Sequence, residues 1–462
     1  MLRRALLILA CLATLVVAWP THAHEAAPAP AATPAPAPVS PAPSAVPAPA
    51  PVSPAPVSLA PAAAPASPAA PALSAPALSA PALSAPALSA PAAAPAPPAP
   101  APAKLHRFVV ERVETAFTAY QQRGTGYQSK ASSRSWLDPG NAALAVFQPQ
   151  LFVQARQSER IVHRFWVPID LVTSASADAI DRGRRLDLIS NSSRQNEAIA
   201  FDWAVAYEAT KWTASARNNV HVEENFRSWA AGIGASLNVA DDAATVSGSV
   251  NNVLDWFSAY NGLGVKTGRA TRSTSNVNVG LTQILTPTTV VHANYGVSAQ
   301  YGVLGNTWNS VPFVNGERFA EVLPRARWRH ALVGRFAQYL PWDGSLKGFY
   351  RFYTDGWGVQ AHAIEGQLSQ RVHPLVYLRA SYRWYTQDGV DFFTTLSPGR
   401  GERRFTADSD LGPFQAHTAG AKVALELPFL FAGAHLDAGY ERYWRTDGLT
   451  VNVALWQAGA RF

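Results

Sequence analysis

The fold of this chain is decided by GSLKGFYRFYTDGWG, residues 344–358, because the pattern of this stretch returns twice further along the sequence. It recurs at Tyr382–Gly389 and, more loosely, at Tyr440–Gly448. Each copy begins with alternating small, apolar and polar residues, continues into aromatic residues interleaved with charge, and stops at a glycine. Alternation with a period of two predicts a β-strand, since successive side chains of a strand point to opposite faces.

The two faces of this strand differ in chemistry. One face carries Leu346, Gly348, Tyr350 and Phe352, and the other carries Lys347, Phe349, Arg351, Tyr353 and Asp355. The charged face is unsuited to a dry core, while the apolar face ends in aromatic residues. A strand of this design is expected in a membrane barrel with lipid outside and water inside.

The composition argues against a helical membrane protein, because no run of about twenty apolar residues occurs after the N-terminal leader. The only cysteine is Cys11 and the only methionine is Met1, so no disulfide is expected once the leader is removed. The 38 Lys and Arg residues against 31 Asp and Glu residues give a net charge of +7. This excess fits a pore that attracts anions, a surface facing anionic lipopolysaccharide, or neither.

Three segments follow one another along the chain. Residues 1–23 carry Arg3 and Arg4, an apolar run and a small-residue site ending at Ala23, which predict a secretory signal peptide. Lipid attachment at Cys11 is the alternative. Residues 24–104 are almost only Ala, Pro, Ser and Val and predict a disordered linker, either a plain spacer or one that binds a periplasmic or cell-wall partner. Residues 105–462 are expected to form the barrel.

The barrel segment divides into about sixteen alternating stretches, which predicts a transmembrane antiparallel β-barrel of about 16 strands. One set of connections is short throughout, as at Thr286-Pro287 and His373-Pro374. The alternate set contains every long connection: about 123–141, 173–195, 258–272, 304–325 and 388–413. Short turns on one rim and long loops on the other are typical of outer-membrane barrels, with both termini at the short rim.

The last strand is expected at residues 449–462 and ends in a terminal phenylalanine. Phe462 shares its face with Trp456, Ala458 and Ala460. This ending resembles the C-terminal signal strand of bacterial outer-membrane proteins, whose last aromatic residue is read by the barrel-assembly machinery. Phe462 is therefore predicted to be the assembly signal.

The three copies of the repeat fall on strands two apart that all run toward the long loops. Their outward aromatic residues are predicted to form an interfacial girdle: Tyr350, Phe352, Tyr382, Trp384 and Tyr440. Charged residues of the opposite faces are predicted to line the lumen: Lys347, Arg351, Arg379, Arg383, Glu426, Asp437 and Glu441. These charges either form a constriction that selects solutes by sign or an ion-pair lattice that stiffens the barrel.

A second basic cluster alternates along one strand: Arg325, Arg327 and Arg329, with Arg335 further on. A ladder of this kind would raise the local concentration of anions in a walled pore. The alternative is that it binds the acidic loop sequence Asp408-Ser409-Asp410 and folds that loop inward.

No catalytic residue, metal site or cofactor is predicted. The histidines are scattered singly and match no close metal-ligand spacing, and neither a phosphate-binding glycine loop nor a nucleic-acid signature is found. A lipid-modifying enzyme would need a serine or carboxylate beside His330 or His417 at the lipid-facing rim. Such a pair could form across strands without being visible in the sequence.

The C-terminal part of the chain, about residues 323–393, resembles the domain-of-unknown-function 3570 family of bacterial outer-membrane proteins. The residues that carry the resemblance are Tyr350-Arg351-Phe352-Tyr353, Asp355, Trp357-Gly358 and His362, followed by Tyr382-Arg383-Trp384-Tyr385, Gln387 and Phe392-Phe393. Phe352 and Trp384 stand where a tyrosine would be typical. The resemblance implies a barrel in the outer membrane and no particular activity.

These patterns together predict a porin-like channel or transporter for small solutes, anionic ones included, in the cell outer membrane of a Gram-negative bacterium. Its expected partners are outer-membrane lipid, the barrel-assembly machinery and small solutes. The first alternative is a non-conducting barrel that anchors or assembles envelope proteins through its linker or outer loops. The second is a barrel-embedded lipid-modifying enzyme.

Overall fold

The computed structural model describes residues 108–124, 144–174, 196–260, 266–305, 310–315, 318–395, 403–431 and 433–462. The expected signal peptide and linker lie outside the described residues. In these ranges, no helix is long and apolar enough to cross a membrane.

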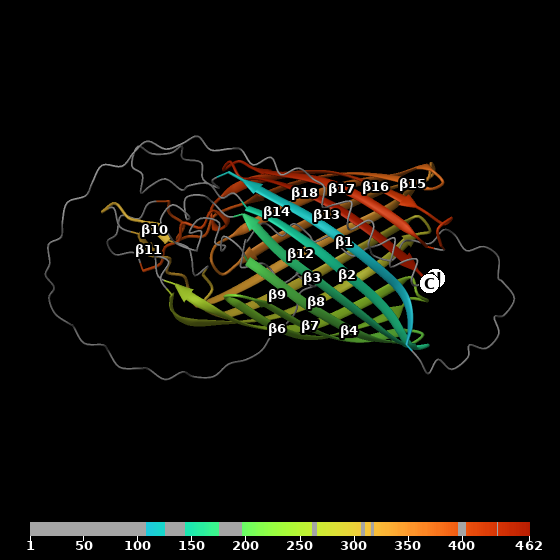
Figure 1. Ribbon diagram of the computed structural model, residues 1–462, viewed down its shortest axis with the longest axis horizontal. Helices are drawn as coiled ribbons and strands as arrows, with labels where there is room; N and C mark the ends of the chain where they lie inside the picture. Colours follow the sequence, from blue (N-terminus) through green and yellow to red (C-terminus); the bar gives the residue numbers. More distant parts are fainter. Residues whose placement is uncertain are drawn as a thin grey trace. The chain divides into compact units, whose positions relative to one another are not determined.

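The described chain forms a closed barrel of antiparallel strands (Figure 1), as the alternation predicts. Its first half consists of β1 (Val109–Arg123), β2 (Leu144–Ser158), β3 (Ile161–Ser174), β4 (Asn196–Glu208), β5 (Trp212–Glu223), β6 (Phe226–Val239), β7 (Ala244–Tyr260) and β8 (Lys266–Thr286). The second half consists of β9 (Thr289–Gly302), β12 (Ala326–Leu340), β13 (Gly344–Asp355), β14 (Gln360–His373), β15 (Val376–Gln387), β16 (Phe414–Glu426), β17 (His435–Arg445) and β18 (Thr450–Arg461). Two short strands, β10 (Ser310–Pro312) and β11 (Arg318–Ala320), pair with each other outside the barrel sheet.

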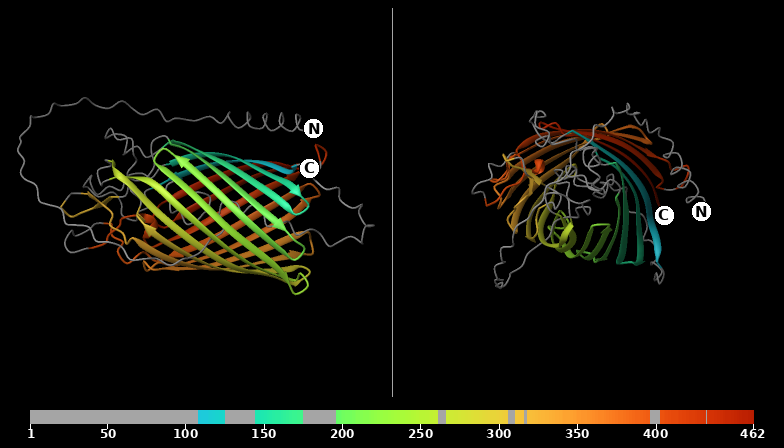
Figure 2. Two further views of the ribbon diagram at one scale, coloured as in Figure 1. Left: turned by 90° about the horizontal axis from the view of Figure 1, so that it is seen from below. Right: turned by 60° about the vertical axis from the view of Figure 1, so that its left-hand side comes forward.

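The barrel closes where β1 pairs with β18. Phe117 lies opposite Trp456, and their ring centroids are 5.9 Å apart. Closure leaves no strand edge unpaired, which the hydrocarbon core of a membrane requires because it offers no water to backbone groups. Figure 2 shows the strands tilted around the barrel axis.

Four of the five connections expected to be long lie together on the same rim. One rim carries turns such as residues 287–288, 341–343 and 374–375, and the described chain enters and leaves the barrel on this side, where Arg112 pairs with Arg461. The other rim carries the long connections 124–143, 175–195, 303–325 and 388–413, together with the short ones 224–225, 261–265, 356–359 and 446–449. The long connection expected at about 258–272 is thus wrong, because β7 and β8 extend into it and leave a loop shorter than 427–434 on the first rim. The two rims are called the short-turn rim and the long-loop rim below.

The outward faces of the strands form an apolar surface. Exposed side chains in its middle include Ile233, Val250, Val279, Leu332, Ile364 and Leu368. Aromatic side chains border this surface at the short-turn rim. Trp342 is 62% exposed there, and Tyr207 stacks on Trp212 with ring centroids 5.3 Å apart. Strands of this length, rising about 3.3 Å per residue and tilted by about 40°, span roughly 30 Å, the thickness of a bilayer core. The chain is therefore a membrane-spanning barrel of the outer-membrane type.

The three copies of the repeat occupy β13, β15 and β17, which all run toward the long-loop rim. Tyr350, Tyr382 and Tyr440 are exposed on the outward face. Arg351 lies on the opposite face, beside Ala363 of β14, which is buried. The expected alternation thus holds in each copy, because the cross-strand register keeps residues of the same face side by side.

Candidate functional site: the barrel lumen and its mouth

The lumen has a basic wall on β12, β13 and β15. Its inward side chains include Arg335, Lys347, Arg351, Arg379 and Arg383. Among the described residues, no carboxylate lies within ion-pairing distance of Arg335, Lys347, Arg351 or Arg379. Arg335 and Lys347 are exposed to the lumen. These positive charges are therefore presented to whatever occupies the lumen.

Within this wall an aromatic ring separates two guanidinium groups. Arg335 lies opposite Phe349, and Glu365 lies between Phe349 and Arg383 in the same row of the sheet. The guanidinium carbons of Arg335 and Arg383 are each 5.5 Å from the centroid of the Phe349 ring. The ring face favours cations, so these contacts hold both guanidinium groups against the wall. Glu365 and Glu441 add two negative charges to the region, fewer than the five positive charges of the basic wall.

The wall formed by β6 to β9 has the opposite character. Its inward positions are small or uncharged, and they include Gly232, Gly234, Ser247, Ser249, Asn251, Asn276, Asn278, Gly280, Asn294 and Ser298. Neighbouring members hydrogen-bond across strands, as in Ser298 Oγ to Asn276 Oδ1 at 2.8 Å. Short side chains do not reach across the lumen, so they leave room beside the basic wall. In the regular register, the inward charges of this wall are the pair Arg272 and Asp255, with Nε and Oδ2 2.7 Å apart.

Several other inward charges are neutralised by a neighbour. Arg217 pairs with Asp202 at 2.5 Å, and Lys422 pairs with Asp437. Asp437 was predicted as a lumen charge, and it lies on that face within this ion pair. Glu426 lies exposed opposite His435 near the short-turn rim. Glu441 lies on the same face of β17 as Asp437.

Arg327 differs from its expected role as a free charge of the ladder. Its guanidinium donates to Asp355 Oδ2 through Nε at 2.9 Å and lies 4.2 Å from the centroid of the Trp357 ring. Only 8% of the residue is exposed. The charge of Arg327 is thus used to brace the β13–β14 hairpin, because Asp355 also accepts the backbone N–H of Trp357 at 2.8 Å.

The rest of the ladder is divided. Arg325 is exposed and precedes the first residue of β12, and its carbonyl accepts the N–H of Gly302. Arg329 lies inward and half-buried, opposite Asp355 in the register. Of the four ladder residues, Arg335 is the one that is exposed deep in the lumen.

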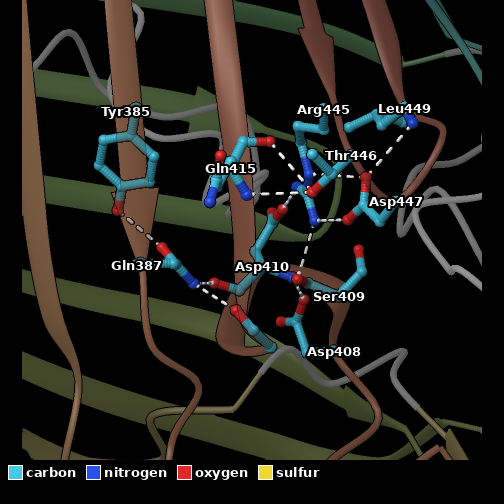
Figure 3. A network of polar contacts seen from close by, with 11 residues as sticks. Tyr385, Gln387, Asp408, Ser409, Asp410, Gln415, Arg445, Thr446, Asp447 and Leu449 are labelled. Atoms are coloured by element: carbon cyan, nitrogen blue, oxygen red, sulfur yellow. Dashed lines mark hydrogen bonds and ion pairs between the residues drawn. The ribbon is translucent and has the colours of Figure 1, made fainter.

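The acidic loop sequence is held by Arg445 and not by the ladder, so the alternative proposed for Arg325, Arg327 and Arg329 is wrong. Figure 3 shows Arg445, at the end of β17, between the side chains of Asp410 and Asp447. Its Nη2 also donates to the carbonyl of Ser409 at 2.8 Å, and its guanidinium carbon lies 3.8 Å from the centroid of the Phe414 ring. The Arg445 side chain is fully buried. The loop is thus anchored to the barrel wall at the long-loop rim.

A second clamp and an apolar cluster complete this anchor. Gln387 donates to the carbonyls of Asp410 at 2.9 Å and Gly412 at 2.6 Å (Figure 3). Leu411 packs with Trp357, Val359 and Val390 in a buried cluster. The long loop before β12 joins the assembly through paired backbone hydrogen bonds between Val322 and Phe405. Parts of two long loops therefore pack together over the hairpin ends.

The predicted girdle residues lie on outward faces near the long-loop rim. Tyr350, Tyr382 and Tyr440 are 42%, 51% and 50% exposed, and Phe352 and Trp384 are half-buried beside them. Phe462 is exposed at the short-turn rim, and its N–H donates to the carbonyl of Glu111 at 2.8 Å. Its predicted use as an assembly signal stays a prediction.

Sequence reasoning assigned no role to Asp355, Gln387, Arg445 and Asp447. The available signal was the repeat itself, whose copies continue into Thr354-Asp355-Gly356 and Thr446-Asp447-Gly448. An aspartate at this place accepts backbone N–H groups of its own turn, and Asp447 Oδ1 accepts that of Leu449 at 3.3 Å. Each turn also receives an arginine, although the partner of Asp355 comes from another strand. In the part of the chain that the structure describes, no group of three His, Cys, Asp or Glu side chains could hold a metal ion.

Residues 187–457 match the family described as protein of unknown function (DUF3570). The chain belongs to this family. The match runs from the segment before β4 into β18, well beyond the residues on which the resemblance in the sequence was based. The matched residues include all the strands that build both walls of the lumen, β6 to β9 and β12, β13 and β15. A comparison with curated proteins gave no match.

Three solved structures are similar to the chain at low identity. A BenF-like porin from Pseudomonas fluorescens Pf-5 has 8% identity and a TM-score of 0.41, covering 76% of this chain and 99% of that one. The outer membrane protein OpdK from Pseudomonas aeruginosa has 6% identity and a TM-score of 0.38, with 78% and 100% covered. OccK8 (OprE) from Pseudomonas aeruginosa has 8% identity and a TM-score of 0.40, covering 76% of this chain and 98% of that one. Similarity at this level carries no statement about the solute.

Proposed function

We propose that the protein is a porin-like channel of the outer membrane that passes small solutes and favours anions. The observation that carries this proposal is the basic wall, in which Arg335, Lys347, Arg351 and Arg379 face the lumen without a carboxylate in ion-pairing distance among the described residues. The adjoining strands β6 to β9, of which β9 pairs with β12, carry short, mostly uncharged side chains on the lumen face. A field of one sign beside low-dielectric walls concentrates solutes of the opposite sign.

Planar-bilayer recording of the purified full-length protein tests this proposal. We expect ohmic conductance steps and a reversal potential that indicates anion preference in a salt gradient. The double substitution Arg335→Gln and Lys347→Gln should lower the anion-to-cation permeability ratio severalfold. Lys211→Gln, which removes a charge in the short turn after β4, is the matched control and should leave the ratio unchanged.

One outcome would contradict the channel, and another would contradict its selection of anions by the basic wall. A folded, heat-modifiable barrel that stays silent in bilayers would favour a non-conducting envelope anchor, for which the packed long loops supply a surface. An unchanged reversal potential in the double variant would remove the basic wall from the solute path. The proposal includes no catalytic step, and the absence of phospholipid hydrolysis or acyl transfer in detergent would be its expected result.

A further inference from the structure

One arrangement of polar side chains is repeated on the outward face near the long-loop rim. Each copy joins a tyrosine on one strand to a polar residue on the next strand of the barrel. The hydroxyl-to-Nδ1 distances are 2.8 Å for Tyr295 and His330, 2.9 Å for Tyr350 and His362, and 2.7 Å for Tyr382 and His417. In the last copy, the hydroxyl of Tyr440 donates to Asn452 Oδ1 at 2.6 Å.

The register explains why the geometry repeats. Tyr350 lies opposite Ile364, and its partner His362 precedes that position by two residues. The same offset separates Ala419 from His417 and Leu332 from His330. Residues two apart in a strand share a face, so each tyrosine and its diagonal partner lie together on the lipid-facing side.

The pairing occupies Nδ1 of each imidazole and leaves Nε2 toward the membrane interface. When a tyrosine hydroxyl donates to Nδ1, the proton of a neutral imidazole is on Nε2. Among the described residues, no protein acceptor contacts Nε2 of His330, His362 or His417. Each pair can therefore offer a hydrogen bond from Nε2 to a group of the membrane interface.

Arg442 adds a permanent charge to the same surface. It is exposed on the outward face of β17 between Tyr440 and Trp444, and within the described ranges it has no hydrogen bond or ion pair. The Trp444 ring stacks on His417 with centroids 5.4 Å apart. No Asp or Glu occurs on the outward faces of the described strands β12 to β18. A charge on a lipid-facing surface without a protein counter-ion is stabilised by an anionic headgroup of the membrane.

We propose that His417, Arg442 and Trp444 bind a phosphate group of the outer-leaflet lipid, and that the Tyr–His pairs extend this surface along β9 to β16. The phosphate of a lipid such as lipid A would accept from the Arg442 guanidinium and from Nε2 of His417, as charge-assisted hydrogen bonds. Tyr440 and Trp444 occupy the interface, where amphipathic rings are favoured. This surface is separate from the lumen and does not depend on conduction.

The test uses the full-length protein folded in non-ionic detergent and titrated with lipid A that carries both phosphates. Native mass spectrometry counts the bound lipid. The double variant His417→Gln and Arg442→Gln should bind at least about fivefold more weakly, since one basic residue near anionic lipid contributes about 1 kcal/mol. The single variant Arg442→Lys keeps the positive charge, so it should bind more tightly than Arg442→Gln and less tightly than the unmodified protein. Arg371→Gln, which removes an arginine from the lumen face of β14, should bind like the unmodified protein.

Three results would overturn the proposal: equal binding of dephosphorylated lipid A, unchanged binding by the double variant, or displacement by inorganic phosphate at the concentration of the lipid. The last would assign the site to a free anion. Heat-modifiable mobility in gels verifies folding of each variant. If the double variant does not fold, Arg442→Gln alone decides, because its side chain is exposed and has no protein partner in the described chain.

Discussion

At the scale of single residues, the fate of an arginine is set by the carboxylates within its reach. Arg327 and Arg445 both end beside an aspartate of a tight turn and over an aromatic ring. Arg335, with no such aspartate nearby, stays exposed in the lumen. Burial of an arginine is tolerated only when it is paired and hydrogen-bonded, so the turn aspartates decide which arginines remain available to a solute.

The substitution Arg445→Gln tests the loop anchor. It removes the cation from between Asp410 and Asp447, and breaking a buried ion pair of this kind costs about 3 kcal/mol. We expect the loop to detach while the barrel stays closed, so trypsin should cleave at Arg403 or Arg404 much faster in the folded variant. Limited proteolysis followed by mass spectrometry measures this rate.

The control is Arg442→Gln, on the same strand but exposed on the outward face. Its loop should be cut at the original rate. A cleavage pattern of Arg445→Gln that equals that of the control would mean that Gln387 and the apolar cluster around Trp357 hold the loop without the arginine.

At the scale of elements, two glycines that face each other across β13 and β14 have different surroundings. A methyl group added at Gly348 would lie 2.0 Å from the Phe336 ring, which covers this glycine from β12. A methyl group at Gly366, which is opposite Gly348 in the register, would meet nothing within 4 Å. The glycine of the repeated stretch is thus required by the neighbouring strand and not by its own backbone.

Gly348→Ala should therefore lower the free energy of unfolding by about 1 kcal/mol, because the Phe336 ring must leave its position. Gly366→Ala should have no such effect. The temperature at which the folded band disappears in heat-modifiability gels measures both variants. If the folded band disappears at the same temperature in both variants, the Phe336 ring moves aside without a loss of stability.

At the scale of the whole molecule, the barrel is joined by a turn or loop at every strand pair except β1 and β18. This seam is held by the backbone pairing of β1 with β18 and by side chains that connect the two strands. Glu114, which is 2% exposed, accepts from Arg112 of its own strand and from Gln457 of β18 at 3.0 Å. Nε2 of His435, on β17, lies 3.5 Å from Oε1 of Glu114. One carboxylate thus links three successive strands at the closure.

Glu114→Gln should weaken the seam by about 2 kcal/mol, since the charge-assisted hydrogen bonds are lost in a buried position. The midpoint of urea unfolding in detergent micelles measures the change. Glu365→Gln, inside the continuous run of hairpins, is the control and should shift the midpoint less. A larger shift of the midpoint in Glu365→Gln than in Glu114→Gln would show that Glu114 contributes no more to stability at the seam than a carboxylate elsewhere in the barrel.

The sequence by itself determined the membrane-barrel class, the sorting of loops between rims, the direction of β13, β15 and β17, and the face on which Arg351 lies. These properties follow from a period of two and from connection lengths, which are local. Only the tertiary structure decided which arginine meets Asp355 or Asp410 and which histidine meets Tyr350. Such partners depend on the register between strands and on loop packing, and residues as distant along the chain as Asp410 and Arg445 carry no mark of each other in a single sequence.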